Sequence, residues 1–96
     1  MTLHILTKAA QSTAAEQMQQ VIGECDVVLL IEEGVTTVLS PEWTGWKQYS
    51  SRIFVLTEDT VARGLACIAE ANAMPMLGMD EFVALTEQHQ QTITWY

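Results

Sequence analysis

The chain has 96 residues and a formal net charge of -8; 49% of its residues are apolar and only 17% are charged. Because twelve acidic residues against four basic ones repel phosphate, this composition excludes a basic surface for direct binding of RNA or DNA. Residues 1–96 are expected to form one domain with a modest core, and the scarcity of charge indicates apolar surface that partner proteins cover.

The sequence also limits the cellular setting. The longest apolar run, Val27–Ile31, is far shorter than a membrane span, and the first residues lack the pattern of a signal peptide. A cytoplasmic protein without a membrane segment is therefore expected. The two cysteines, Cys25 and Cys67, have no CxxC spacing and no histidine nearby, which argues against a zinc site and a disulfide scaffold.

The first predicted elements are a strand and a helix. Residues 2–6 alternate as in a strand, and Ser12 or Thr13 is placed to cap a helix that ends near Gly23. Glu16 lies three positions after Thr13, as in a capping box. The apolar face of this helix is expected to comprise Ala14, Ala15, Met18, Val21 and Ile22.

A central strand is predicted at residues 25–31, CDVVLLI. This run is short, branched and almost continuously apolar, which is typical of a parallel strand covered on both faces, so helices are expected on both sides of the sheet. Residues 32–34 end the strand. Residues 35–40 predict one or two helical turns before Pro41, and residues 42–50 form the least regular segment.

The stretch at residues 57–65, TEDTVARGL, follows a third predicted strand at residues 52–56. Thr57 is expected to be the helix N-cap, the two acids after it favour the positive end of the helix dipole, and Arg63-Gly64 predicts the helix end. Capping explains the stretch better than a catalytic site does, and a longer helix continuing to Ala71 is the alternative. The residues expected to pack inward are Val61 and Ala62.

The last elements complete the fold prediction. Residues 74–77 indicate a short edge strand, where proline is tolerated, and residues 92–96 a final alternating strand. Between them, Asp80 or the residue before it caps a helix that faces the core through Phe82, Val83 and Leu85. This order predicts an α/β three-layer sandwich, with a mostly parallel sheet of about five short strands flanked by helices.

The cysteines are the candidate catalytic residues. Cys25 opens a strand beside Asp26, and a nearby carboxylate works against thiolate formation, so a small buried side chain is favoured over a nucleophile. Cys67 follows Arg63 by four positions and would share its helical face if that helix continued, which would favour the thiolate. Its apolar neighbours nevertheless favour burial.

Other polar residues offer no recognisable catalytic set. Neither His4 nor His89 has a serine, cysteine or carboxylate spaced as in a triad. Glu32 and Glu33 follow the central strand where an open parallel sheet binds ligands, but no glycine-rich phosphate loop accompanies them, so an acidic capping role is favoured. No GxGxxG or Walker pattern occurs, and no cofactor or metal is expected.

The aromatic residues are candidates for an interface. A chain this small carries three tryptophans, and aromatic residues are enriched where proteins meet. The alternative is that Trp43 and Trp46 close over the sheet. The interface candidates are Trp43, Trp46, Trp95 and Tyr96.

Four motifs taken together resemble a known family. They are LHIL at residues 3–6, VVLLIEEGV at residues 27–35, FVLTEDTVARGL at residues 54–65, and DEFVALTEQH at residues 80–89, followed by a final tryptophan. In order and spacing they are similar to the TusB/DsrH family of the DsrE/DsrF/DsrH superfamily. The similarity covers nearly the whole chain and implies a DsrEFH-like fold.

The resemblance implies a subunit of a cytoplasmic sulfur relay. In such a complex TusC-like and TusD-like homologues form a heterohexamer with this chain, and the chief catalytic cysteine belongs to the TusD/DsrE chain. The Tus complex passes persulfide sulfur toward 2-thiouridine at the tRNA wobble position, and the Dsr complex serves sulfur oxidation. This chain would contact tRNA only indirectly, and without its partners it would form a homo-oligomer.

One departure from the family bears on catalysis. DsrH proteins of sulfur oxidisers carry a cysteine in the first helix, and matching the EEG turns places that position at Met18. A thioether does not form a persulfide, so the resemblance implies a non-catalytic structural subunit. The alternatives are a sulfur carrier that uses Cys67, and a homo-oligomer with a small-ligand site near Glu32 and Glu33.

Overall fold

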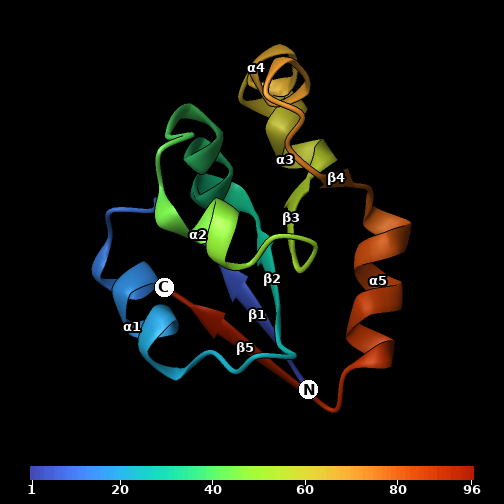
Figure 1. Ribbon diagram of the computed structural model, residues 1–96. Coiled ribbons are helices and arrows are strands. Elements are labelled where there is room, and N and C mark those ends of the chain that lie inside the picture. The colour runs from blue at the N-terminus through green and yellow to red at the C-terminus, as the bar shows by residue number, and fades with distance from the viewer.

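A five-stranded, fully parallel sheet organises the computed structural model, which describes residues 1–96 (Figure 1). The strand order is β4-β3-β2-β1-β5, and β1 pairs with both β2 and β5. Each strand is therefore reached from the previous one by a crossover that carries helices, as the short, branched, apolar strands predicted. The strands are β1 (Thr2–Leu6), β2 (Val27–Leu30), β3 (Ile53–Leu56), β4 (Met76–Leu77) and β5 (Gln91–Trp95).

Helices cover both faces of this sheet, which confirms the predicted α/β fold (Figure 1). One of them, η1, is a 3₁₀ helix and occupies the segment predicted to form one or two helical turns. The irregular segment after Pro41 contains one short α-helix, α2. The helices are α1 (Thr13–Val21), η1 (Glu32–Leu39), α2 (Thr44–Gln48), α3 (Thr57–Ala62), α4 (Ala66–Ala71) and α5 (Met79–Gln88).

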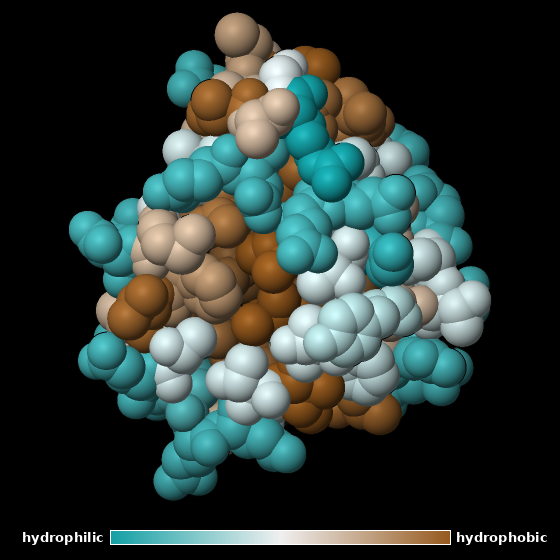
Figure 2. Space-filling view, turned by 180° about the vertical axis from the view of Figure 1, so that it is seen from behind, coloured by the Kyte–Doolittle hydropathy of each residue, from teal (hydrophilic) through white to brown (hydrophobic).

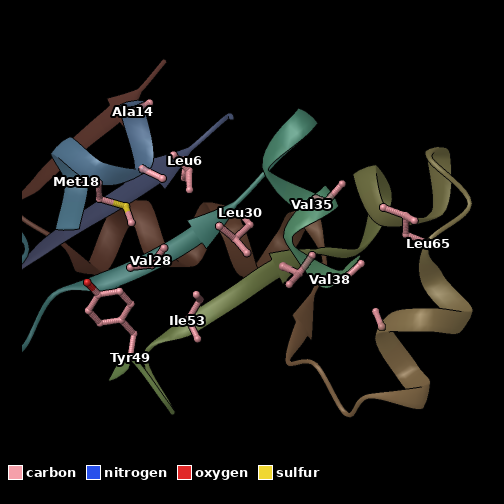
Figure 3. Close-up of a cluster of buried hydrophobic side chains, with 13 residues drawn as sticks. Leu6, Ala14, Met18, Val28, Leu30, Val35, Val38, Tyr49, Ile53 and Leu65 are labelled. Carbon is pink, nitrogen blue, oxygen red and sulfur yellow. The ribbon is translucent and has the colours of Figure 1, made fainter. Parts of the chain in front are cut away.

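The larger core lies between the sheet and the side formed by α1, η1, the end of α2 and α4. Figure 3 shows its side chains gathering from β1, β2 and β3 against α1 and η1. Leu6 and Val28 are fully buried there, and Tyr49 closes this cluster at its α2 end. The 13 buried residues are Leu6, Ala14, Ala15, Met18, Val28, Leu30, Val35, Val38, Tyr49, Ile53, Val55, Leu65 and Ala69.

The second face of the sheet has a thinner cover. Phe82 and Leu85 of α5 pack against it, yet no residue of α5 is itself buried. The predicted inward position of Val83 is wrong, since this side chain is 49% exposed. The buried residues of this face are Leu3, Ile5, Leu29, Leu56 and Leu77.

Several helix starts differ from the sequence prediction. Leu56, not Thr57, occupies the N-cap of α3, and Thr57 is its first helical residue. Gly78, not Asp80 or Met79, precedes the first residue of α5. Ser12 does cap α1, because its hydroxyl oxygen accepts a hydrogen bond from Ala15 N at 3.2 Å.

A glycine in the left-handed region separates α3 from α4. Gly64 has a φ of 69°, a value that glycine adopts at low cost, and the helix therefore stops before it. The alternative of one helix reaching Ala71 is wrong. Gly34 has another role: a Cβ at this position would lie 2.3 Å from Leu6 O, so only glycine allows η1 to pass this close to the end of β1.

Candidate functional site

Both candidate cysteines are exposed, which contradicts their expected burial. Cys25 lies in the loop between α1 and β2, at the amino end of the parallel strands. Cys67 lies in α4, which contacts η1 beyond the carboxyl end of β2. The two thiols are therefore at opposite ends of the sheet and do not form a pair.

The expected neighbour of Cys67 is not on its helix. Arg63 follows the last residue of α3, and α4 begins only after Gly64 and Leu65. The two residues consequently do not share a continuous helical face, and the arrangement that motivated a reactive thiol at this position is absent. What remains at Cys67 is an exposed thiol near the start of a short helix.

Three aromatic rings form a cluster around α2. The ring of Trp43 packs edge-on against Trp46 at 6.1 Å and against Tyr49 at 6.4 Å between ring centroids. Trp46 Nε1 donates a hydrogen bond to Ser40 O at 3.1 Å. Both tryptophans pack against the larger core, but they stay partly exposed. They line a pocket of about 650 Å³ together with Pro41, Glu42, Thr44, Lys47 and Gln48.

The C-terminal aromatic residues behave differently from each other. Trp95 stacks on His4, with 6.1 Å between ring centroids, and packs against the larger core. Tyr96 is 82% exposed and is the most exposed large aromatic side chain. Of the four interface candidates, Tyr96 thus has the most exposed ring, while the three tryptophans are partly buried.

A partly buried polar network connects β5, β1 and the loop before β2. Trp95 Nε1 donates to His4 Nδ1 at 3.1 Å, and His4 Nε2 lies 2.9 Å from Asp26 Oδ2. Because an indole N–H only donates, His4 Nδ1 is the acceptor, and Nε2 therefore carries the proton that it donates to Asp26. With 1% of its surface exposed, His4 has no access to a substrate, so this Trp-His-Asp set holds strands together.

The network also determines the charge state of Asp26. Burial raises the pKa of this carboxyl, but hydrogen bonds from Gly23 N, His4 Nε2 and Thr2 N outweigh burial and lower the pKa from 3.8 to about 2. Sequence analysis missed this set because its members are distant in the chain: Asp26 is 22 residues and Trp95 is 91 residues from His4. Only the strand pairing brings them together.

The acids of the stretch at residues 57–65 cap neighbouring helices. Asp59 Oδ2 accepts a hydrogen bond from Glu32 N, the first residue of η1, at 2.6 Å. Glu58 Oε2 accepts one from Met79 N, the first residue of α5, at 3.1 Å. Capping therefore does account for this stretch, although the capped helices are its neighbours.

None of the four pockets is lined by Glu32 or Glu33, which counts against a ligand site there.

Large apolar side chains are exposed on α3 and α5. Val61, expected to pack inward, is 59% exposed, and Met79 and Val83 are 44% and 49% exposed. The view from behind shows apolar side chains gathered near the middle of that face, with hydrophilic side chains around them (Figure 2). No group of three or more histidine, cysteine or acidic side chains is placed to hold a metal ion, and none of the helices has the length and apolar character of a membrane span.

Known proteins resemble this chain over most of its length. A family model described as DsrH like protein matches residues 8–92. A relative named Protein TusB from Yersinia enterocolitica serotype O:8 / biotype 1B is 36% identical over 72 residues, 73% of this chain and 75% of the relative. Proteins of the same name from Pectobacterium parmentieri and Escherichia coli O1:K1 / APEC are 28% and 26% identical over 95 residues, which cover 97% of this chain and 99% of each relative.

Proposed function

Because this chain belongs to the family of DsrH-like proteins, we propose that it is a non-catalytic structural subunit of a cytoplasmic sulfur-relay complex of the TusBCD/DsrEFH type. The reaction served by the complex is 2-thiolation of the tRNA wobble uridine. The relatives named Protein TusB support this branch over one that serves sulfur oxidation.

The burial of Met18 is the observation that carries the non-catalytic role. At this position DsrH proteins of sulfur oxidisers place a cysteine, and here a thioether lies in the larger core with 0% of its surface exposed. A buried thioether neither forms a persulfide nor meets a donor. The remaining thiols, Cys25 and Cys67, lie outside α1 and at opposite ends of the sheet, so neither takes the place of that cysteine.

The proposed partners are TusC-like and TusD-like homologues, two copies of each with two of this chain. The net charge of -8 supports an indirect contact with tRNA, since the partners would have to supply the cations that bind phosphate. The exposed apolar side chains of α3 and α5 support an assembly with other subunits. Without those partners the chain is expected to self-associate.

Co-expression tests the structural role. The chain is produced with TusC-like and TusD-like proteins from the same cell, purified through a tag on this chain, and examined by size-exclusion chromatography with light scattering. We expect a complex that contains all three chains. Recovery of this chain alone, as a stable monomer, would contradict the proposal.

A sulfur carrier that uses Cys67 is the second candidate, and the exposure of this thiol favours it. Incubation with a persulfide donor followed by intact mass measurement tests it, because each added sulfur atom increases the mass by about 32 Da. The structural role predicts no adduct on this chain in the assembled complex. An adduct that Cys67→Ser removes and the matched variant Cys25→Ser retains would establish the carrier instead.

A further inference from the structure

We propose that exposed residues of α3 and α5 form a docking strip for a different chain, one that presents lysine or arginine side chains around an apolar centre. The inference deepens the proposed function, on which it rests, by assigning the surface and the chemistry of a partner subunit. The strip comprises Glu58, Val61, Met79, Asp80, Val83 and Glu87, all of them exposed.

Helical spacing and one hydrogen bond make the strip continuous. Glu58 and Val61 are three residues apart on α3, and Met79 and Val83 are four residues apart on α5, so each pair shares a helical face. The two helices are joined where Glu58 Oε2 accepts the hydrogen bond from Met79 N at 3.1 Å. Val61 and Val83 thus lie on either side of this junction.

The three carboxylates of the strip border its apolar centre, which consists of Val61, Met79 and Val83, and none of them forms an ion pair within the chain. Asp80 precedes Val83 by three residues and Glu87 follows it by four, so both flank its side chain on α5. The ion pairs of the chain are His4–Asp26 and Lys8–Glu33, and neither involves the strip. An apolar surface edged by unpaired negative charge is complementary to an apolar surface edged by positive charge.

A second copy of this chain has few free cations to place around an apolar centre, since only Lys47 and Arg63 are exposed without an ion pair or a side-chain hydrogen bond. Of its four basic residues, Lys8 is paired with Glu33, while Arg52 donates to two backbone carbonyl oxygens and lies 5.5 Å from the centre of the Tyr49 ring. Lys47 lies on α2, which leaves Arg63 as the one cation close to the strip in sequence. Two strips facing each other would bring six carboxylates together, so like charges disfavour the homodimer through this surface.

Binding by charge-introducing variants tests the strip. Val61→Asp and Val83→Asp are compared with wild type and with the matched control Val21→Asp, which alters an equally exposed valine on α1. Each is titrated with purified TusC-like and TusD-like proteins from the same cell, after circular dichroism has shown native folding. We expect Val61→Asp and Val83→Asp to weaken binding about tenfold or more, and Val21→Asp to change it by less than about twofold.

Salt dependence tests the charge of the partner. Binding of wild type should weaken as sodium chloride is raised, and the double variant Asp80→Asn, Glu87→Gln should show a smaller dependence. Wild-type binding that is insensitive to salt, or retained in both valine variants, would overturn the docking strip and leave the proposed function standing. Failure of wild type to bind either homologue would overturn both.

Discussion

Replacement of Asp26 by asparagine should remove a pH-dependent contribution to stability. The carboxyl has a folded-state pKa of about 2 against 3.8 in the absence of its partners. Since one pKa unit corresponds to about 1.4 kcal/mol, the ionised form contributes about 2 kcal/mol to the free energy of unfolding. Asparagine keeps the shape but loses the charge, and it turns one accepting oxygen into a donor facing backbone N–H groups or His4.

The sign of the pH dependence follows from the lowered pKa. A carboxyl with a folded-state pKa below its unfolded value stabilises the protein fully above the unfolded value, and the contribution is lost as the pH falls from 3.8 through about 2. The difference in free energy of unfolding between wild type and Asp26→Asn should therefore be about 2 kcal/mol near pH 7. It should shrink below about pH 4.

Urea denaturation followed by tryptophan fluorescence, at a series of pH values, measures this difference. Asp80→Asn is the matched control, because Asp80 is exposed and accepts no hydrogen bond within the chain, so its removal should leave the pH profile close to that of wild type. The network would be refuted as a source of stability if Asp26→Asn and wild type showed equal unfolding free energies at pH 7. A difference that stayed constant down to pH 2 would refute the role of the carboxylate charge.

Three further substitutions and one chemical modification probe other features. Gly34→Ala places a methyl group 2.3 Å from a backbone carbonyl oxygen and should lower the unfolding free energy by about 3 kcal/mol or prevent folding. Gly64→Ala places its methyl group in open space but at a φ of 69°, and should lower the unfolding free energy by about 1 kcal/mol. Thermal unfolding measures both. Trp95→Phe keeps a ring but removes the N–H donor of the buried network, for an expected loss of about 1 kcal/mol in urea denaturation. Cys25 and Cys67 should both react with a thiol reagent in the native protein at rates close to those in denaturant, and slow labelling of either would contradict its exposure.

The sheet could be predicted because its strands carry a local signal. Residues 27–31 are continuously apolar and mostly branched, which is typical of a parallel strand covered on both faces and therefore predicts helices on both sides. The edge position of β4 follows equally from Pro75, since proline lacks the N–H that a central strand needs. Residue type and order therefore contain enough information to define the parallel architecture.

The positions that could not be predicted depend on contacts between distant segments. Cys25 directly precedes the apolar run of the central strand in sequence, but Asp26 accepts hydrogen bonds from Thr2 N and Gly23 N, and β2 begins only at Val27, so Cys25 lies outside the strand. Thr57 is a good N-cap by type. In the structure, however, it is the first helical residue of α3, and the acids after it accept hydrogen bonds from the first residues of η1 and α5, which are distant in sequence.

The same acids connect the fold to the proposed assembly. Glu58 holds the start of α5 against α3, so the spacing of Val61 and Val83 across the docking strip depends on a carboxylate that also belongs to the strip. A partner cation could pair with this carboxylate without displacing Met79 N, because each of the two carboxylate oxygens accepts more than one hydrogen bond. The short helix after β3 thus contributes capping hydrogen bonds inside the fold and, in the proposed assembly, charge at the docking strip.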